Sequence, residues 1–341
     1  MRKQNITLKD VAKAAKVSIS TASKAINNKT VVAERTRKKV LNVAKKLGYR
    51  ASFIPRSLRS KNSKAIGLIL PNIVNPFFCT LANAVEDIAL KEGYVVILGS
   101  TKDEIKRESL YFDIFAERWI DGIILAGGTS EDEKYIQYIQ EQGIPIVFID
   151  REIEEHFTNS IGIDNEIAMY EATKYLIDLG HKCISFISGP LSVKVFTKRL
   201  KGYKKALENS GLEFEENLVE ESDETASGGR IATRNLLKRN KGITAILASN
   251  DMMAIGSLKE ISEADLRVPE DISLMGFDNI PLTSVVTPSL TTVSQPSYEM
   301  GQEAMKLLLE IIQGKKTAKS KIILGTEIVI RKSTSPPAKG N

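Results

Sequence analysis

Apolar positions near the N-terminus recur at the spacing of helices. They predict a first helix that follows Thr7, with Asp10 three residues later completing a capping box. A second helix is expected over about residues 19–27, and a third over about residues 34–47, which Gly48 would stop in a left-handed conformation. Small residues where the first two helices would cross, joined by a short turn, are typical of a helix-turn-helix.

Beyond residue 63 the pattern changes to short, continuous apolar runs separated by helical stretches. Such runs are typical of buried parallel strands in βαβ units. The expected strands are residues 65–70, 95–98, 122–125, 146–149, 183–187, 245–247 and 272–276. The series of strands and helices breaks near residues 160–165, and at residues 290–293 the chain would cross back to the first series. We therefore expect two similar lobes. Ligands of such folds bind at the carboxyl ends of the strands, here between the lobes.

The predicted fold class is an all-α helix-turn-helix unit joined to an α/β body of two lobes with parallel sheets. The ordinary content of 42% hydrophobic and 26% charged residues fits a globular protein. The expected divisions are a helix-turn-helix unit at 1–50, a linker at 51–62, an α/β body at 63–333 and a tail at 334–341. Lobe one would comprise about 63–162 and 294–319, and lobe two about 163–292 and 321–333.

Charge is distributed unevenly along the chain. Residues 1–64 contain 18 Lys and Arg against two acidic residues, a net charge of +16, whereas the remainder carries −10. A basic arm on an acidic body indicates that one end meets a polyanion, with counterion release supplying affinity. From charge alone, a solvated charged face and binding to an anionic membrane remain alternatives to nucleic-acid binding. The helix-turn-helix pattern favours double-stranded DNA as the partner.

Other classes of protein find little support. No apolar run approaches the length of a membrane helix, and the N-terminus lacks the apolar core of a secretory signal, so we expect a cytoplasmic protein without membrane contact. Cys79 and Cys183 lie far apart, and His156 and His181 are the only histidines. We therefore expect no metal, no cofactor and no catalytic residues, and the chain is not expected to be an enzyme.

The second helix supplies most of the candidate DNA contacts. In a helix-turn-helix this helix lies in the major groove, where Ile19 would contact a thymine methyl group and Lys24 a guanine. The candidates are Thr7, Ser18, Ile19, Ser20, Thr21, Ser23, Lys24, Asn27 and Tyr49. Among them Ser18, Thr21, Asn27 and Tyr49 would contact phosphates. The alternative is a three-helix bundle whose Ser and Thr residues only cap helices.

Several residues of this region occur in a characteristic order: Thr7-Leu-Lys-Asp-Val-Ala-Lys-Ala-Ala15, Val17-Ser18, Thr21-Ala22-Ser23-Lys24, Asn27, Thr36-Arg37-Lys-Lys-Val40 and Leu47-Gly48-Tyr49. This order resembles the headpiece of the lactose-repressor (LacI/GalR) family. Two positions depart from the family pattern. Lys16 stands where the family favours Gly or Asn, and Ala33 replaces a Ser whose cap typically contributes about 1 kcal/mol.

The resemblance implies that residues 51–62 form a hinge that becomes a short helix on operator DNA. There Leu58 would wedge into the minor groove, with Arg56 and Arg59 beside it. Pro55 stands where the family usually has Ala and disfavours helical geometry at Ile54, so this helix would start later or form less readily. Without the resemblance, a flexible linker is the simpler interpretation.

The body carries a second set of such residues: Asn75-Pro-Phe-Phe78, Asp121-Gly-Ile-Ile124, Ile149-Asp150-Arg151, Ser188-Gly-Pro190, Arg199-Leu-Lys-Gly-Tyr203, Ser249-Asn-Asp251, Gly276-Phe-Asp278 and Pro288-Ser-Leu-Thr-Thr292. These resemble the effector domain of the same family and imply the fold of periplasmic sugar-binding proteins. The resemblance places Asp150, Arg199, Asn250 and Asp278 in an effector cleft, with Phe77 and Phe78 as an apolar wall. Carboxylates that accept hydrogen bonds and Arg and Asn that donate them suit a polyol.

One departure bears on the ligand. Glu224 stands where several sugar-responsive members have an aromatic residue that stacks on the sugar. Lys194 and Lys198, near Arg199, would suit a sugar acid or a sugar phosphate, although a surface location is an equal alternative. The effector class therefore stays open between sugar, sugar acid and sugar phosphate.

The sequence predicts a transcription regulator, expected to act as a repressor. It would bind a pseudo-palindromic operator as a homodimer and respond to a small carbohydrate-type effector. No leucine heptad occurs in the tail, so we expect no tail-mediated tetramer. The alternatives are a solute-binding protein of sugar transport, and a regulator controlled by a phosphorylated carrier protein.

Overall fold

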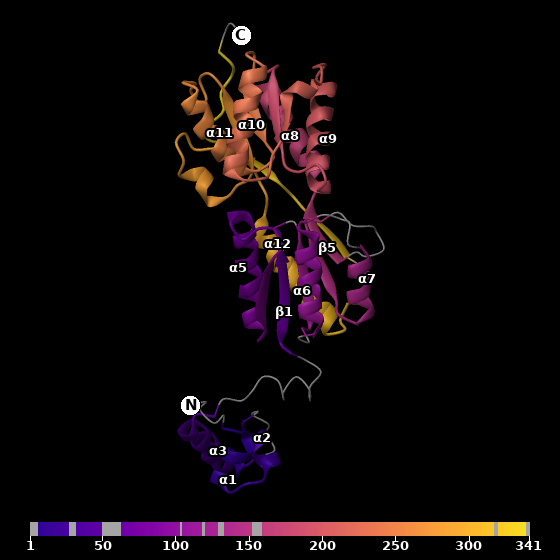
Figure 1. Ribbon diagram of the computed structural model, residues 1–341, viewed down its shortest axis with the longest axis vertical. Helices are drawn as coiled ribbons and strands as arrows, with labels where there is room; N and C mark the ends of the chain where they lie inside the picture. The colour runs from indigo at the N-terminus through magenta and orange to yellow at the C-terminus, as the bar shows by residue number, and fades with distance from the viewer. Residues whose placement is uncertain are drawn as a thin grey trace. The chain divides into compact units, whose positions relative to one another are not determined.

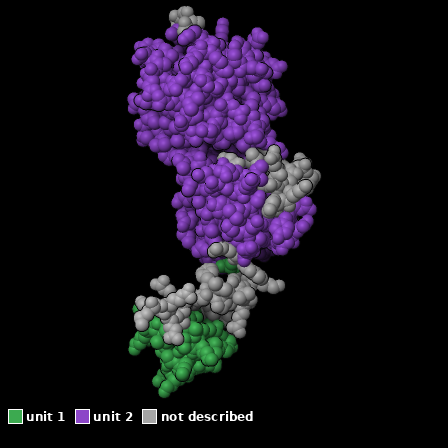
Figure 2. Space-filling model, viewed as in Figure 1, with its two compact units in different colours: residues 1–63 green, residues 64–341 purple. Residues whose placement is uncertain are grey.

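The computed structural model describes residues 6–26, 32–49, 63–102, 104–117, 120–128, 133–151, 159–316 and 320–338. The chain divides into two compact units, residues 1–63 and 64–341, which Figure 2 colours separately. Within the described ranges, no helix combines the length and apolar character that crossing a membrane requires.

The described residues of the N-terminal unit form the helices α1 (Leu8–Ala15), α2 (Ile19–Ile26) and α3 (Glu34–Leu47). The predicted capping box at α1 is confirmed, because the Asp10 amide donates to Thr7 Oγ1 at 3.3 Å and the Thr7 amide donates to Asp10 Oδ2 at 2.9 Å. At α2 the Thr21 amide donates to Ser18 Oγ at 3.0 Å, as expected of a cap. Between the end of α1 and the cap at Ser18 the chain makes a tight turn, in which Lys16 adopts a φ of 54°.

Small residues allow the three helices to approach closely. The buried core of this unit consists of Val11, Ala12, Ala15, Ala22, Ala25, Val40 and Ala44. Gly48 ends α3 with a φ of 67°, as predicted, and Ala33 makes no side-chain cap. These local features follow from residues three or four positions apart, which is why the sequence alone predicts them.

The body contains two six-stranded sheets. In the first, of order β11-β5-β4-β3-β1-β2, every strand pair is parallel. Its strands are β1 (Ala65–Leu70), β2 (Val95–Ser100), β3 (Gly122–Ala126), β4 (Ile146–Ile149), β5 (Asn159–Ile163) and β11 (Ser320–Leu324). We call this sheet and its helices lobe one.

The second sheet, of order β12-β10-β9-β8-β6-β7, is parallel except for the pair between β10 and β12. Its strands are β6 (Ile184–Ser188), β7 (Val219–Glu221), β8 (Ala245–Ala248), β9 (Ser273–Asp278), β10 (Thr291–Ser294) and β12 (Glu327–Val329). We call this sheet and its helices lobe two. All seven strands that the sequence predicts are present, so the predicted α/β body with parallel sheets is confirmed.

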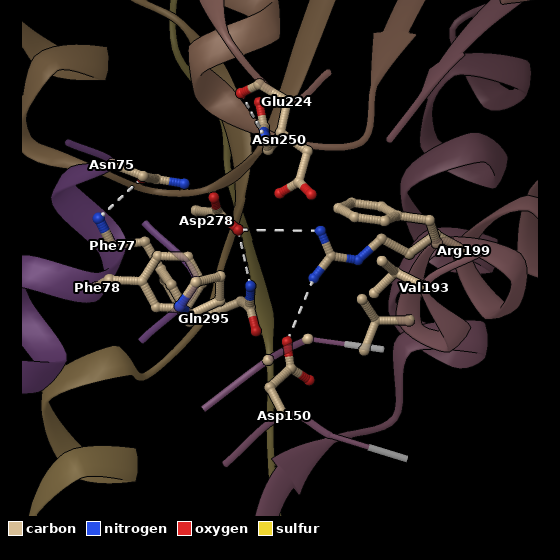
Figure 3. Close-up of a pocket in the computed structure, with 15 residues that line it drawn as sticks. Asn75, Phe77, Phe78, Asp150, Val193, Arg199, Glu224, Asn250, Asp278 and Gln295 are labelled. Carbon is tan, nitrogen blue, oxygen red and sulfur yellow. Dashed lines mark hydrogen bonds and ion pairs between the residues drawn. The ribbon is translucent and has the colours of Figure 1, made fainter. Parts of the chain in front are cut away.

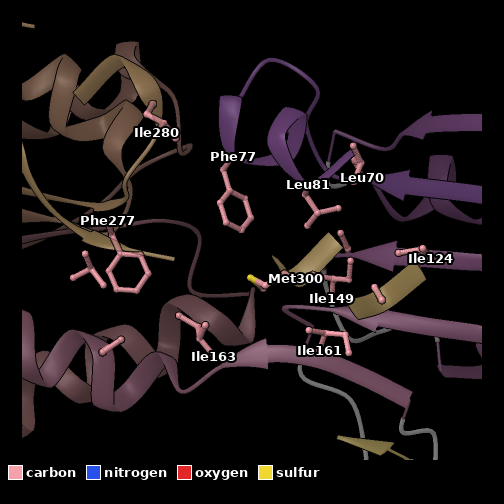
Figure 4. Packing of buried hydrophobic residues seen from close by; sticks show 14 of the residues in the cluster. Leu70, Phe77, Leu81, Ile124, Ile149, Ile161, Ile163, Phe277, Ile280 and Met300 are labelled. Carbon is pink, nitrogen blue, oxygen red and sulfur yellow. The ribbon is translucent and has the colours of Figure 1, made fainter. Parts of the chain in front are cut away.

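Helices cover both faces of each sheet (Figure 1). In lobe one, α5 (Pro76–Lys91) packs beside α12 (Ser297–Ile312), and α6 (Ile105–Glu117) beside α7 (Glu133–Glu141). In lobe two the packed pairs are α8 (Asn165–Asp178) with α9 (Lys194–Asn209) and α10 (Ala226–Arg239) with α11 (Asp251–Glu263), and short 3₁₀ turns lie at Glu216–Leu218 and Pro281–Ser284. One apolar cluster includes residues of both lobes, among them Phe77, Met300 and Phe277 (Figure 4).

The chain passes between the lobes three times, after β5, after β10 and after β11. The last crossing corrects the predicted boundary, which assigned residues 321–333 to lobe two. Ile322 lies opposite Ile161 of β5, so β11 extends the sheet of lobe one. The chain therefore crosses to lobe two at residues 325–326. Of the segment 321–333, only β12 and the residues after it lie in lobe two.

The C-terminal segment is bound to lobe two through a buried histidine. His181 Nε2 lies 2.9 Å from the carbonyl oxygen of Ser335, and its Nδ1 lies 3.0 Å from Thr244 Oγ1. Burial lowers the pKa of His181, so the neutral ring is favoured. Residues 334–335 of the expected tail are therefore part of the packed structure.

Candidate functional site

A cavity lies between the two lobes, at the carboxyl ends of their strands. Pro71, Gly127 and Asp150 directly follow β1, β3 and β4, whereas Asp278 ends β9. The cavity encloses about 450 Å³ of space, which includes open solvent at its mouth. Its lining residues are Pro71, Asn75, Phe77, Phe78, Gly127, Gly128, Asp150, Val193, Val195, Phe196, Arg199, Glu224, Asn250, Asp278 and Gln295 (Figure 3).

All six residues that the sequence analysis assigned to the effector cleft line this cavity: Phe77, Phe78, Asp150, Arg199, Asn250 and Asp278. The two phenylalanine rings meet edge to face, with centroids 5.1 Å apart. Lys194 and Lys198 are not among the described residues that line the cavity. Ligand contact by the six residues stays a prediction.

Arg199, on α9, is the cationic centre of the cavity wall. The residue is 3% exposed, and its guanidinium stacks on the ring of Phe277 at 3.8 Å. Nε donates to Asn165 Oδ1 at 2.8 Å, and Nη1 donates to the carbonyl oxygen of Ser249 at 2.5 Å. These contacts fix the plane of the guanidinium. The fixed plane in turn gives a ligand a fixed set of donors.

Two carboxylates flank this guanidinium, one from each lobe. Asp150 Oδ2 lies 3.8 Å from Nη2 of Arg199, and Asp278 Oδ1 lies 4.0 Å from Nη1. Asn165 of lobe two donates to Asp150 Oδ1 at 3.0 Å, a hydrogen bond that joins the lobes. Gln295 donates through Nε2 to Asp278 Oδ1 at 2.7 Å.

Burial dominates the electrostatics of Asp278. It raises the pKa of this carboxyl to about 7, although Arg199 and the hydrogen bond from Gln295 act in the opposite direction. Behind it, burial and the neighbouring Asp278 raise the pKa of Asp251 well above its usual range. Thr292 Oγ1 and the Ile280 amide donate to the two oxygens of Asp251, at 2.6 and 2.8 Å. The cavity is thus backed by two buried acids, and the charge of Asp278 disfavours the ionisation of Asp251.

Asn250 combines a structural role with its place in the cavity wall. Its Oδ1 accepts the Met253 amide at 2.7 Å and caps α11, and its Nδ2 donates to the carbonyl oxygen of Glu224 at 3.0 Å. Substitution at this position therefore affects the helix as well as the cavity.

The three acidic residues that line the cavity share an unusual backbone conformation. Asp150, Glu224 and Asp278 have φ values of 46°, 66° and 116°. Positive φ is costly for residues other than glycine and concentrates at functional sites. The fold accepts this cost at three positions around one cavity.

Comparison with known proteins extends over both units. Residues 7–52 match the model of the bacterial regulatory proteins of the lacI family, and residues 173–334 match a periplasmic binding protein-like domain. Catabolite control protein A of Priestia megaterium is 37% identical over 332 residues, which cover 97% of this chain and 99% of that protein. The chain belongs to the LacI family.

Solved structures of LacI-family members agree. The lac repressor dimer bound to operator and the anti-inducer ONPF superposes with a TM-score of 0.86 at 28% identity, covering 97% of this chain and all of that one. The complex of the transcriptional regulator CelR with cellobiose superposes with a TM-score of 0.74 at 30% identity. The match covers 96% of this chain and 99% of that one. The protein is thus a DNA-binding transcription regulator and not an enzyme, and its helix-turn-helix unit rules out the solute-binding alternative.

In this LacI-family chain, α2 presents its candidate DNA contacts to solvent. Ile19 is 51% exposed, and Ser20 and Lys24 are exposed as well. Ser18 and Thr21 bond each other through their hydroxyls at 2.8 Å, so they serve the helix end, and Thr7 serves the capping box of α1. Ser23 and Tyr49 are half-buried, and Tyr49 packs against the unit's core. Asn27, Arg56, Leu58 and Arg59 lie outside the described residues.

Four polar residues of the cavity region were not among the sequence candidates: Asn75, Asn165, Glu224 and Gln295. Asn75 stood in a quoted motif, and Glu224 was noted only as a departure from the family. Asn165 and Gln295 lie where the chain changes lobes, and the change in strand pattern there was a usable signal. No group of three or more His, Cys, Asp or Glu suited to a metal occurs among the described residues.

Proposed function

We propose that this LacI-family regulator is a cytoplasmic repressor that binds a pseudo-palindromic operator as a homodimer. A small carbohydrate-type effector in the cavity between the lobes controls it. The single observation that carries the effector role is the set of polar contacts that cross the cavity from one lobe to the other.

These contacts make the lobe geometry sensitive to a ligand. Asp150 of lobe one is bonded to Asn165 and paired with Arg199, both in lobe two. Asp278 of lobe two bonds Gln295 on the crossing segment, and Asn75 of lobe one contributes a further hydrogen bond. A ligand that replaces or adds to these bonds changes the relative stability of open and closed arrangements. Effector binding and DNA binding are then thermodynamically linked.

Exposed apolar side chains support the homodimer. Strand β2 forms one edge of the lobe-one sheet, and its Val95, Ile97 and Leu98 are 45%, 38% and 44% exposed. Leu90 on α5 and Leu110 on α6 are also exposed, on helices that both contact β2. An apolar sheet edge of this kind is a surface for association and is costly to leave in water. A second copy of the chain covers it in the proposed dimer.

The DNA side of the proposal is supported by charge and by exposure. Residues 1–64 carry a net charge of +16, and α2 presents Ile19, Ser20 and Lys24 to solvent. In the proposed complex these residues contact base edges, whereas Ser18, Thr21, Asn27 and Tyr49 contact phosphates. Leu58 of the hinge enters the minor groove between Arg56 and Arg59.

The effector proposal is tested with full-length protein and an operator selected from random duplex DNA. Thermal unfolding and operator affinity are measured against sugars, disaccharides, sugar acids, sugar phosphates and nucleosides. A ligand at a hundredfold excess over its Kd stabilises the folded state by about 2.7 kcal/mol. Arg199→Ala should abolish this shift, whereas Lys194→Ala, on the same helix but outside the described lining, should retain it.

The proposal is wrong in its effector part if no compound changes either the unfolding temperature or the operator affinity. That result would favour the phosphorylated carrier protein as the signal. A ligand that shifts unfolding equally in wild type and Arg199→Ala would place its site elsewhere. A selected DNA without inverted repeats would contradict the dimeric operator.

A further inference from the structure

The part of the cavity wall at the start of α9 is apolar. Val193, Val195 and Phe196 all line the cavity and are buried. They form an apolar cluster of their own, separate from the larger clusters in the cores of the two lobes. Ligand sites are commonly lined by apolar and aromatic side chains of this kind. We call these three residues the apolar wall of lobe two.

Helix α9 forgoes a side-chain cap at this wall. Val193 occupies its N-cap position and makes no cap hydrogen bond. Ser, Thr, Asp and Asn are the residues preferred there, so an apolar residue lowers the stability of the helix. In lobe one, α5 keeps such a cap, because the Phe77 amide donates to Asn75 Oδ1 at 3.0 Å. The difference indicates that the apolar surface at Val193 has a use outside the helix.

The two lobes place apolar side chains at equivalent positions. Strand β6 occupies in its sheet the place that β1 occupies in the other, next to the edge strand. Helix α5 follows β1, and its first turn carries Phe77 and Phe78. Helix α9 follows β6, and its first turn carries Val195 and Phe196. Figure 3 shows Phe77 and Phe78 on one side of the cavity and Val193 on the other.

The ring of Phe196 is held in place by its neighbours. A Cβ at Gly189 would lie 2.5–2.7 Å from three atoms of this ring, so a side chain there would displace it. The guanidinium carbon of Arg199, one turn further along α9, lies 5.6 Å from the ring centroid. No other aromatic residue of lobe two is among the described residues that line the cavity. A ring fixed in this way offers a ligand a preformed apolar surface.

A sugar in its ring form is complementary to such a cavity. Its C–H groups pack against apolar and aromatic side chains, whereas its hydroxyls bond polar groups. Gln295 Oε1 is buried in the cavity wall and accepts no hydrogen bond from any described residue, so a hydroxyl there supplies the missing donor. An alditol, the open-chain reduced form of a sugar, has hydroxyls but no fixed C–H face. It also loses more conformational freedom on binding.

Resting on the proposed effector function, we infer that Phe196 is a specificity-determining residue of the cleft and that the effector is a single aldose ring. The C–H groups of this pyranose or furanose pack on Phe196 of lobe two and on Phe78 of lobe one. Phe196 thereby supplies the aromatic surface that lobe two lacks at Glu224. Because the two apolar surfaces belong to different lobes, a ring that contacts both stabilises one arrangement of the lobes over the other.

The test compares ring and open-chain ligands on the full-length protein by calorimetric titration, with weak ligands measured by displacement. The probes are ribose, xylose, glucose, galactose and mannose, each with its alditol. At least one sugar should bind, and its alditol should bind at least about tenfold more weakly, a difference of about 1.4 kcal/mol. The inference is overturned if none of the five sugars binds, or if the alditol of every bound sugar binds within about threefold of it.

Variants show whether Phe196 makes this distinction. Phe196→Ala should weaken sugar binding by at least about tenfold and change the affinity for the alditol by less than about threefold. Phe196→Leu, which keeps an apolar side chain, should weaken sugar binding less than Phe196→Ala does. Ile231→Ala, at an exposed position of α10 in the same lobe, should leave both affinities unchanged. A cooperative thermal transition without sugar verifies that each variant is folded.

Gly189→Ala tests the same contact while leaving Phe196 in the chain. The added methyl group displaces the ring, so sugar binding should weaken. Combined with Phe196→Ala it should cause little further loss, because the ring that it displaces is already absent. Unchanged sugar affinity in Phe196→Ala would overturn the inference. So would an equal loss of sugar and alditol binding, which would assign Phe196 to positioning Arg199 instead.

Failure here is separable from failure of the proposed function. A ligand of another class that binds wild type and is lost in Arg199→Ala would keep the effector cleft and discard the sugar ring on Phe196. Absence of any ligand among these probes and the broader panel would discard both.

Discussion

Gln295 Nε2 donates a hydrogen bond of 2.7 Å to Oδ1 of Asp278. Gln295 lies on the segment that leads from β10 of lobe two to α12 of lobe one, and Asp278 ends β9 in the wall of the cavity. The bond therefore joins a segment between the lobes to a residue expected to contact the effector. The charge state of Asp278 and the geometry of the crossing segment are physically connected through it.

The stability of the protein should depend on pH through Asp278. Burial raises its pKa from 3.8 to about 7, so the folded state holds the proton more tightly than the unfolded chain. The stability that this provides is complete below about pH 3.8 and is lost as the pH rises to about 7. Asp278→Asn has no such loss. Its unfolding free energy relative to wild type should increase by on the order of 2 kcal/mol between pH 5 and pH 8.

This prediction is checked by denaturant unfolding of both proteins across that pH range, without ligand. Asp265→Asn, at an exposed position, serves as the control and should track wild type at every pH. A difference between Asp278→Asn and wild type that stays constant from pH 5 to pH 8 would contradict a buried, proton-holding carboxyl.

The apolar edge of lobe one should control assembly. Ile97→Asp places a charge on the exposed edge strand β2, where a second chain would otherwise cover an apolar side chain. Sedimentation should show a shift from dimer to monomer, and operator affinity should fall by at least about tenfold, or 1.4 kcal/mol, because two linked headpieces become separate. Tyr138→Asp, at an exposed position of α7, should remain dimeric. A dimeric Ile97→Asp protein would exclude β2 from the interface.

The role of Lys24 can be separated into base contact and phosphate contact. If Lys24 contacts a guanine, Lys24→Ala should weaken binding to the selected operator by about 1–3 kcal/mol and relax preference at one base pair. Binding to random DNA should change much less. Fluorescence anisotropy at several salt concentrations measures both affinities, with Lys45→Ala, at an exposed position of α3, as the charge-matched control. Equal weakening on both DNAs, with a salt slope reduced by about one, would assign Lys24 to a phosphate instead.

Close packing in lobe two should make Gly202 intolerant of a side chain. A Cβ at this position of α9 would overlap the carbonyl oxygen of Glu166, and α8 could not yield without moving its backbone. Gly202→Ala should therefore lower the unfolding free energy by about 2 kcal/mol or more. Gly242→Ala, where a Cβ meets only the Asn240 side chain at 3.4 Å, should be nearly neutral. Urea unfolding of the two variants makes the comparison, and equal stabilities would refute the packing argument.

The sequence by itself determined the local structure of this protein. The capping box of Thr7 and Asp10, the cap at Ser18 and the stop at Gly48 all depend on residues within a few positions of one another. Seven strands of the body were also predicted, because a continuous apolar run is typical of a buried strand. Strand β2 departs from that expectation, since its Val95, Ile97 and Leu98 are exposed at the edge of the sheet. Assignment of Asp150, Arg199, Asn250 and Asp278 to one cleft needed the resemblance to the LacI family, since no local pattern joins them.

The tertiary structure alone decided how distant segments pair and what they leave unpaired. Residues 320–324 and 327–329 have similar strand-forming character, and only the free edges offered by β5 and β10 assign one to each lobe. The same holds for the acceptors of the cavity. Whether Gln295 Oε1 has a donor, or Asp278 is buried enough to hold its proton, depends on groups brought together from both lobes. The number of residues between these groups along the chain does not give their distances in the folded protein. Short-range periodicity is encoded locally, whereas the chemistry of the cavity arises from contacts that form only when the lobes have folded together.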